Sequence, residues 1–244
     1  MRIAEEYNLY VIEDCAQAHG TEYNGTKVGS IGHIGVFSFF ATKHMTTGEG
    51  GIITSNNEDW VKKARIIRNH GLINRDDHVC LGYNYRMDEM AAAMGLVQLR
   101  KLDYFNKQRI KNSFFLLNKL SNETPKWFCM PKLSKNIKHT FFLCPLGVNT
   151  DNGFDTRDVV EKLREKGIEV RQRYHEPLYK QKVIQELSPY PNGCPFTCQP
   201  KENIPNYKNL ILPNAEKLAG NILGLPNHPK LTKEDLSFIV SAIK

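Results

Sequence analysis

The chain has 244 residues and a formal net charge of +7, from 33 basic and 26 acidic residues. That length suits one large or two small domains with a buried core. The charge is spread along the chain, without basic clusters interleaved with aromatics, so we expect no nucleic-acid binding; it suits an anionic small molecule such as a nucleotide-linked substrate. No apolar run approaches the roughly 20 residues of a membrane span, and no signal-peptide pattern is present. We therefore expect a cytoplasmic protein without a membrane segment.

Six cysteines at irregular spacing predict reduced thiols and not a disulfide framework. Cys194 and Cys198 are the only close pair in the sequence. No second Cys or His pair stands at a matching spacing, so zinc is the minor interpretation there and we expect no metal site.

The N-terminal part alternates short apolar runs with polar turns, as strands joined by loops do. After a helix that ends near residue 7, we expect three strands, Leu9–Ile12, Gly35–Phe39 and Gly51–Thr54. An Asn24-Gly25 pair predicts a hairpin-like turn between the first two. The stretch Ser55-Asn56-Asn57-Glu58 is a capping box, and it predicts a helix that Gly71 ends.

A long helical pattern follows the polar loop 74–86, beginning at Asp88 as its cap and running to about Leu120. A helix of this length often bridges two domains. We assign residues 1–105 to the remaining part of a large, cofactor-binding domain and 106–244 to a small C-terminal domain. In the second domain we expect strand His139–Leu143, helix Asp155–Glu165, strand Gly167–Tyr174, a Pro- and Cys-rich loop 188–205, helix Pro213–Ile222 and a last helix capped by Thr232.

One lysine, Lys43, lies in a Gly-rich loop between two expected strands, five residues after the hydroxyl of Ser38. The first expected strand delivers Glu13 and Asp14 at its end. Ligands of α/β proteins gather where strands end. A carboxylate, an amine and a hydroxyl at one sheet edge predict a site for an aldehyde cofactor that bears a phosphate, pyridoxal phosphate.

Several stretches occur together in the order and spacing of a known family. They are Val11-Ile12-Glu13-Asp14-Cys15-Ala16-Gln17-Ala18, Phe37-Ser38-Phe39, Thr42-Lys43, Thr46-Thr47-Gly48-Glu49-Gly50-Gly51, Gly82-Tyr83-Asn84-Tyr85-Arg86-Met87, Leu212-Pro213-Asn214-Ala215-Glu216 and Leu225-Pro226-Asn227-His228-Pro229. Over essentially its whole length, the chain resembles the DegT/DnrJ/StrS-type sugar aminotransferases.

The resemblance implies an α/β, fold-type I architecture like that of aspartate aminotransferase. It would comprise a partial large domain with a mixed sheet plus a small C-terminal α+β domain. It further implies a homodimer with shared active sites and pyridoxal phosphate as the cofactor. The implied reaction moves an amino group, usually from glutamate, to a nucleotide-activated keto-deoxysugar, for surface polysaccharide or glycan biosynthesis.

The resemblance also implies roles for individual residues. Lys43 stands at the Schiff-base lysine, which would hold the cofactor and later carry a proton. Asp14 matches the acid that pairs with the pyridine nitrogen, and Gln17 a residue beside the ring and its phenolic oxygen. Ser38 matches the hydroxyl that binds the phosphate, and Asn84 an asparagine that reaches the phosphate from the partner subunit. Without the resemblance, each residue has an ordinary interpretation. Lys43 would be a solvated lysine, and Asp14 a strand-end cap or salt-bridge partner, a role that Glu13 suits as well. Gln17 would be a helix-start residue, Ser38 a strand serine and Asn84 a turn residue.

Further positions of the chain match the family or depart from it. Tyr174, His175 and the Leu178-Tyr179 region resemble the small-domain segment that faces the substrate. Some members are dehydratases in which a histidine replaces the lysine; Lys43 is kept here, which favours amino transfer. His44 follows it where many members have Asn, a departure to which the sequence attaches no consequence.

The larger departure lies before residue 9, because family members carry a longer N-terminal part, on the order of one domain's worth of residues. We expect the first strand to have an exposed edge and the sheet to lack partners on its faces. The alternative hypothesis is therefore a non-catalytic remnant or subunit that needs a partner chain.

Overall fold

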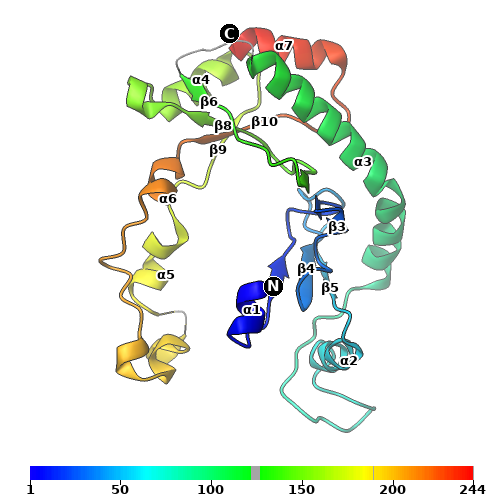
Figure 1. Cartoon of the computed structure of the whole chain (residues 1–244). Coiled ribbons are helices and arrows are strands. Elements are labelled where there is room, and N and C mark those ends of the chain that lie inside the picture. The colour runs from blue at the N-terminus through cyan, green and yellow to red at the C-terminus, as the bar shows by residue number, and fades with distance from the viewer. Residues whose placement is uncertain (122–126, 189, 244) are drawn as a thin grey trace. The chain divides into compact units, whose positions relative to one another are not determined.

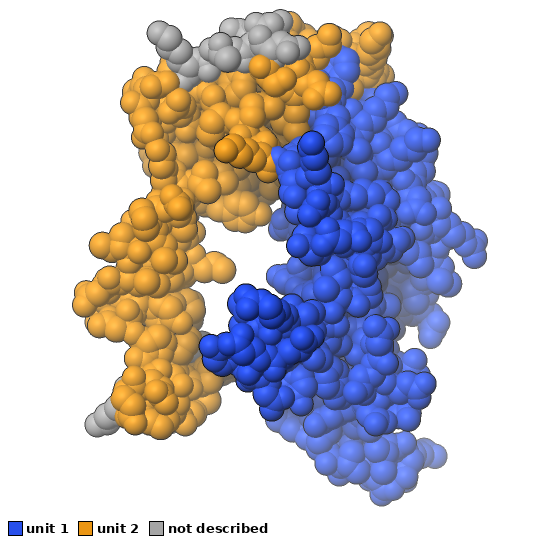
Figure 2. All heavy atoms as spheres, in the orientation of Figure 1, with its two compact units in different colours: residues 1–115, 133–142, 227–231 blue, residues 116–132, 143–226, 232–244 orange. Residues whose placement is uncertain are grey.

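The computed structural model describes residues 1–121, 127–188 and 190–243 (Figure 1). These residues form two compact units, which Figure 2 colours separately. Unit 1 comprises Met1–Phe115, Leu133–Phe142 and Asn227–Leu231; unit 2 comprises Leu116–Lys132, Leu143–Pro226 and Thr232–Lys244. Each unit is thus assembled from separate stretches of chain. The expected domain boundary after residue 105 stays a prediction.

The central sheet of unit 1 has the strand order β1-β4-β5, made of β1 (Ile12–Asp14), β4 (Ile34–Ser38) and β5 (Gly51–Thr54). β1 runs parallel to β4, and β4 antiparallel to β5, so the sheet is mixed as expected. The first strand begins at Ile12 and not at Leu9. The N–H of Val11 donates to the side-chain Nδ1 of His33 at 2.8 Å and not to a neighbouring strand. The backbone N–H of His33 donates to Val11 O at 2.9 Å.

One face of this sheet is apolar and open to solvent. The pairings Asp14↔Val36 and Val36↔Ile53 place those three residues on one face, together with Ile12 and Ser38 two residues along their strands. Ile12 is 65% exposed, Val36 37% and Ile53 51%. β1 and β5 form the two edges of the sheet. The exposed edge and uncovered face expected from the sequence are therefore present.

A second, smaller sheet of unit 1 joins residues far apart in sequence. Its order is β3-β2-β7, from β3 (Thr26–Lys27), β2 (Glu22–Tyr23) and β7 (Ile137–Lys138), all antiparallel. Asn24 (φ 49°) and Gly25 (φ 79°) both adopt positive φ, the geometry of a type I′ turn, so the predicted hairpin is confirmed.

Three helices complete unit 1: α1 (Arg2–Glu6), α2 (Glu58–Ile67) and α3 (Glu89–Ser121), of which residues 89–115 belong to this unit. The cap of α2 is Asn57, whose Oδ1 accepts from Asp59 N and Trp60 N at 3.0 and 3.1 Å. The predicted cap at Ser55 is wrong, because its hydroxyl donates to His33 O instead. The predicted cap of α3 is confirmed, since Asp88 Oδ1 accepts from Ala91 N at 2.8 Å.

Unit 2 is built on an antiparallel sheet of order β6-β8-β10-β9. The strands are β6 (Phe128–Cys129), β8 (Cys144–Val148), β9 (Arg171–Arg173) and β10 (Ile222–Leu225), and its longer helices are α4 (Thr156–Glu165) and α7 (Lys233–Ile243). The shorter elements are α5 (Lys182–Gln185), α6 (Pro213–Leu218) and five single-turn 3₁₀ helices, Thr150–Asn152, Leu178–Lys180, Pro191–Gly193, Phe196–Cys198 and Lys201–Asn203. Its core includes Leu146, Val160, Leu163, Val170, Leu223, Ile239 and Ile243, each 5% exposed or less.

Three predicted elements of the second half differ from the structure. The expected strand Gly167–Tyr174 is reduced to β9, Arg171–Arg173. The expected strand His139–Leu143 is displaced to Cys144–Val148, because residues 139–142 belong to unit 1, where Phe141 is buried with φ 52°. The expected helix Pro213–Ile222 stops at Leu218, and Ile222 starts a strand. In the described ranges, no helix is both long and apolar enough to cross a bilayer.

Candidate active site

Lys43 lies in a short, internally bonded loop between β4 and β5. Its N–H donates to Phe40 O at 2.9 Å, while Thr46 Oγ1 donates to Phe39 O at 3.0 Å and accepts from Gly48 N at 2.9 Å. The half-buried Lys43 places Nζ 5.0 Å from the centroid of the Phe142 ring, within the range of a cation–π contact. The backbone of the loop and one aromatic ring thus fix where the amine points.

His44, next in the chain, is 3% exposed and anchors the loop. Its Nε2 lies 3.3 Å from Thr140 O, and its ring centroid lies 5.4 Å from that of His19 and 5.8 Å from that of Phe142. Burial, then the nearby Arg109 guanidinium, lower the pKa of His44 to about 3. The imidazole is therefore neutral near pH 7, and it donates to Thr140 O when its proton is on Nε2.

The two acids at the end of β1 differ in their hydrogen-bond partners. Glu13 accepts three backbone hydrogen bonds, from Gly29 N at 2.8 Å, Ile31 N at 2.8 Å and Gly32 N at 2.7 Å. Asp14 is exposed, and its Oδ1 accepts only the N–H of Ala16, at 3.0 Å. Within the described ranges, its second oxygen accepts no hydrogen bond. Glu13 is thus committed to the backbone, and Asp14 is the carboxylate available to a ligand.

Asp14, Ser38 and Lys43 come to one edge of one sheet. β1 and β4 are parallel, so their carboxyl ends, which carry Asp14 and Ser38, meet there, and Lys43 follows in the loop. Asp14 and Ser38 share a face on neighbouring strands, offset by two residues, which corresponds to a spacing of about 8 Å. This set of groups suits pyridoxal phosphate: an acid for the ring nitrogen, a hydroxyl for the phosphate and an amine for the aldehyde. The individual roles stay predictions.

The other predicted site residues are placed less closely together. Gln17 is exposed, three residues beyond Asp14. Asn84 is exposed in the loop before α3, where it pairs with Asn69 in an isolated bridge. Among the described residues, no hydrogen bond or ion pair joins Asn84 to Ser38 or Lys43. Tyr174 and His175 are exposed residues of unit 2, directly after β9.

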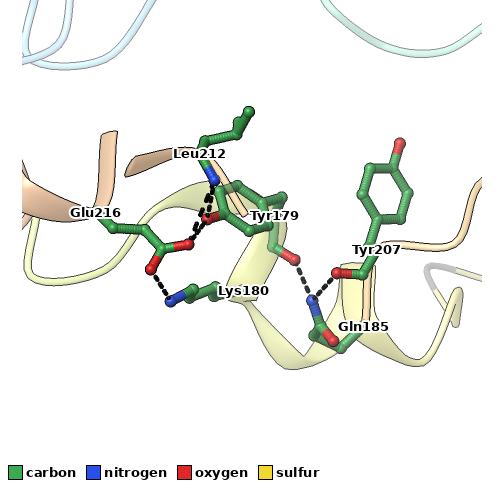
Figure 3. A network of polar contacts seen from close by, with 6 residues as sticks. All are labelled: Tyr179, Lys180, Gln185, Tyr207, Leu212 and Glu216. Atoms are coloured by element: carbon green, nitrogen blue, oxygen red, sulfur yellow. Dashed lines mark hydrogen bonds and ion pairs between the residues drawn. The ribbon is translucent and has the colours of Figure 1, made fainter. Parts of the chain in front are cut away.

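Unit 2 contains a polar network around Tyr179 (Figure 3). The Tyr179 hydroxyl donates to Glu216, whose other oxygen lies 2.8 Å from Lys180 Nζ, and Leu212 N donates to the Tyr179 hydroxyl at 3.3 Å. The hydrogen bond from Lys180, with a second from Tyr179, lowers the pKa of Glu216. The network links Tyr179 and Lys180, which precede the segment 181–211, to Leu212 and Glu216, which follow it. Two of its members had a sequence signal: Tyr179, in the region that resembles the substrate-facing segment, and Glu216, in a motif shared with the family.

In the described part of the chain, no group of three or more His, Cys, Asp or Glu side chains is arranged to hold a metal ion. Cys194 and Cys198 have their sulfur atoms 3.1 Å apart, as free thiols.

Comparison with known proteins identifies the family. The sequence profile of the DegT/DnrJ/EryC1/StrS aminotransferase family matches residues 1–244. The chain belongs to this family. DegT/DnrJ/EryC1/StrS aminotransferases are pyridoxal-phosphate-dependent enzymes, so the cofactor expected from the sequence is the cofactor of the family.

Individual relatives agree with this assignment. The chain is 31% identical to a GDP-perosamine synthase of Caulobacter vibrioides, over 100% of this chain and 60% of that protein. It is 32% identical to a dTDP-4-amino-4,6-dideoxy-D-glucose transaminase of Shigella dysenteriae, over 99% of this chain and 60% of that protein. An aminotransferase structure from Psychrobacter cryohalolentis superposes with a TM-score of 0.82 at 29% identity, covering 100% of this chain and 63% of that one.

Two conclusions follow for the DegT/DnrJ/EryC1/StrS chain. The predicted fold class, an α/β aminotransferase with a partial large domain, is confirmed by the superposition and by the mixed sheet of unit 1. The chain spans about three fifths of the length of the relatives it matches, 60% of both the Caulobacter vibrioides and the Shigella dysenteriae protein.

Proposed function

We propose that this chain forms part of a pyridoxal-phosphate-dependent aminotransferase that acts on a nucleotide-linked keto-deoxysugar. The observation that carries the proposal is the meeting of Asp14, Ser38 and Lys43 at one sheet edge in a chain of this family. The amino donor, glutamate in this proposal, gives its amino group and leaves as the 2-oxo acid. The sugar's carbonyl oxygen is replaced by that amino group.

When bound, pyridoxal phosphate supplies an electron-withdrawing ring that stabilises negative charge on the reacting carbon. Lys43 would hold the aldehyde through its amine and would serve as the proton carrier once that amine is free. Asp14 would keep the ring nitrogen protonated, and Gln17 would contact the ring and its phenolic oxygen. Ser38 would bind the phosphate through its hydroxyl, together with the partner subunit's Asn84 in a cytoplasmic homodimer.

The substrate class rests on charge and on the relatives. A nucleotide-linked sugar carries a diphosphate, and the chain has a formal net charge of +7. Two relatives are named for GDP- and dTDP-linked sugars. Tyr174 and His175 are the residues of unit 2 that we assign to the sugar side of the site. The product would serve surface polysaccharide or glycan biosynthesis.

The first experiment is cofactor capture. The purified protein is mixed with pyridoxal phosphate, and the appearance of a yellow colour and of a borohydride-fixed pyridoxyl group on Lys43 is expected. Lys43→Ala should lose both signals, whereas Lys62→Ala, at an exposed lysine on α2, should keep them. A wild-type chain that stays colourless and carries no pyridoxyl group refutes the proposal for this chain acting alone.

A second experiment addresses the reaction. Glutamate and a panel of nucleotide-linked keto-sugars are offered to the cofactor-loaded protein, and 2-oxoglutarate release is measured. Activity with at least one nucleotide sugar is expected, and it should depend on Lys43. Cofactor capture without release of 2-oxoglutarate on any panel member would exclude catalysis by this chain alone.

The uncovered sheet face favours one alternative, a subunit that is active only with a partner chain. Ile12, Val36 and Ile53 expose an apolar surface on the face that also carries Asp14 and Ser38. In that case, activity should appear only after addition of a full-length relative whose own Schiff-base lysine is replaced by alanine, and it should be lost again with Lys43→Ala in this chain.

A further inference from the structure

The segment His139–Phe142 is a fixed support inside unit 1. Thr140 is 1% exposed and Phe141 0%. Asn227 Nδ2 donates to Phe141 O at 2.7 Å and to Ser113 Oγ at 3.1 Å, and the Thr140 and Thr21 hydroxyls are hydrogen-bonded at 2.8 Å. Asn227 and Thr21 therefore hold this segment without a contribution from the lysine loop, and Ser113 in turn fixes Asn227.

Two neighbouring residues of the lysine loop rest on that support. His44 Nε2 meets Thr140 O at 3.3 Å, and Lys43 Nζ lies over the Phe142 ring at 5.0 Å from its centroid. In the described ranges, the His44 contact is the only side-chain hydrogen bond from residues 41–45 to another part of the chain. The His44 ring also packs against His19 and Phe142.

We propose that His44 is a positioning residue for Lys43: its hydrogen bond to Thr140 O locks the lysine loop onto His139–Phe142 and presents the amine to the cofactor aldehyde. This inference rests on the proposed role of Lys43. Condensation forms one C=N bond between the Lys43 nitrogen and the aldehyde carbon and releases one water. A loop that is already ordered loses less conformational entropy when that bond forms, so capture is tighter and faster.

The surroundings keep the His44 imidazole in the form that this role requires. Among the described residues, the charged and titratable groups that act on it are Arg109, His19 and His139, none of which is a carboxylate. Lys43 precedes it in the chain, with Nζ over the Phe142 ring. Burial, then the neighbouring Arg109, His19 and His139, lower its pKa to about 3. A neutral ring with its proton on Nε2 can donate to Thr140 O at any pH at which the enzyme would work.

The test compares substitutions that differ in the donor. His44→Leu removes the donor and keeps most of the bulk, whereas His44→Gln keeps an N–H donor near the position of Nε2. His228→Leu, at an exposed histidine, is the matched control. For each protein, the dissociation constant for pyridoxal phosphate and the rate of borohydride-trapped labelling of Lys43 are measured. We expect His44→Leu to weaken binding about tenfold, since a buried carbonyl loses its donor, and His44→Gln and His228→Leu to stay within about threefold of wild type.

A second readout needs no cofactor. Amide hydrogen exchange across residues 41–47 should be faster in His44→Leu than in wild type and close to wild type in His44→Gln. If His44→Leu does not fold, His44→Asn, whose amide is too short to reach Thr140 O, takes its place. Equal exchange and equal capture in the donor-free and donor-retaining variants overturn the proposal. A wild type that never labels on Lys43 refutes the proposed function instead, and the exchange comparison still decides whether His44 orders the loop.

Discussion

His44 makes the stability of the folded chain depend on pH in a way that can be isolated. Its pKa is about 3 in the folded state against an ordinary value of 6.5. As the pH falls below 6.5, the unfolded chain binds a proton at His44 and the folded chain does not, so stability decreases with falling pH until about pH 3. His44→Gln keeps the hydrogen-bond donor but cannot titrate. The variant should therefore lose less stability in acid than the wild type.

The size of the effect follows from the two pKa values. Between pH 7.5 and pH 5, the wild type should lose about 2 kcal/mol of unfolding free energy through His44, because each pKa unit corresponds to about 1.4 kcal/mol over the part of the window below 6.5. The pKa values of His19 and His139 are also lowered, chiefly by burial. Their contributions occur in both proteins and cancel in the difference.

Urea unfolding at both pH values, followed by fluorescence, measures this difference. The chain has two tryptophans, and Trp60 belongs to unit 1, so a Trp127→Phe background leaves a reporter for the unit that contains His44. The expected result is a wild-type loss that exceeds the His44→Gln loss by about 2 kcal/mol. A difference below about 0.5 kcal/mol, or one of opposite sign, would refute the assignment of His44 as a buried neutral imidazole.

The other predictions concern acids and a thiol. Glu13→Gln should destabilise unit 1 by about 2 kcal/mol in urea unfolding, because three backbone donors lose a charged acceptor. Asp14→Asn should change stability by less than about 0.5 kcal/mol and should weaken cofactor capture. The reverse pattern would contradict the assignment of Glu13 to the backbone and of Asp14 to the ligand. Glu216→Gln should speed proteolysis within 181–211 several-fold at pH 7. Because the pKa of Glu216 is lowered in the folded state, proteolysis of the wild type should speed up only as the pH falls below the usual carboxylate range. A wild-type proteolysis rate that does not change with pH would contradict this role of Glu216. Burial, with smaller contributions from Glu13 and Asp14, raises the pKa of Cys15 to about 11, so iodoacetamide at pH 8 should label the exposed thiols and leave Cys15 unmodified until urea is added, as read by mass spectrometry.

The sequence was sufficient where local chemistry decides the structure. The Asn24-Gly25 turn and the Asp88 cap follow from short-range rules and are present. The Thr232 cap holds as well, since Asp235 N donates to Thr232 Oγ1 at 3.1 Å and Thr232 N donates to the Asp235 carboxylate at 2.9 Å. The edge that gathers Asp14, Ser38 and Lys43 follows from the general rule that ligands bind at strand ends.

The sequence was insufficient where tertiary contacts decide. The run Phe141-Phe142-Leu143 has the composition of a strand, yet Phe141 adopts φ 52° because residues 139–142 pack into unit 1 while Leu143 begins the part that belongs to unit 2. The hydrophobic periodicity of the sequence does not indicate to which of the two units a residue belongs. For the same reason, His44 carried no signal in the sequence, since its partner Thr140 lies 96 residues away.

Unit 1 is assembled from three separate stretches of chain, and this affects when it can fold during synthesis. Asn227, whose side chain donates to Phe141 O in the segment that the lysine loop contacts, follows Lys43 by about 180 residues in the sequence. Contacts of such long sequence separation close late and slowly. The amine of Lys43 should therefore acquire its final setting only after Asn227 has been synthesised, and capture of the vitamin B6 aldehyde on nascent chains of increasing length would report when that setting is complete.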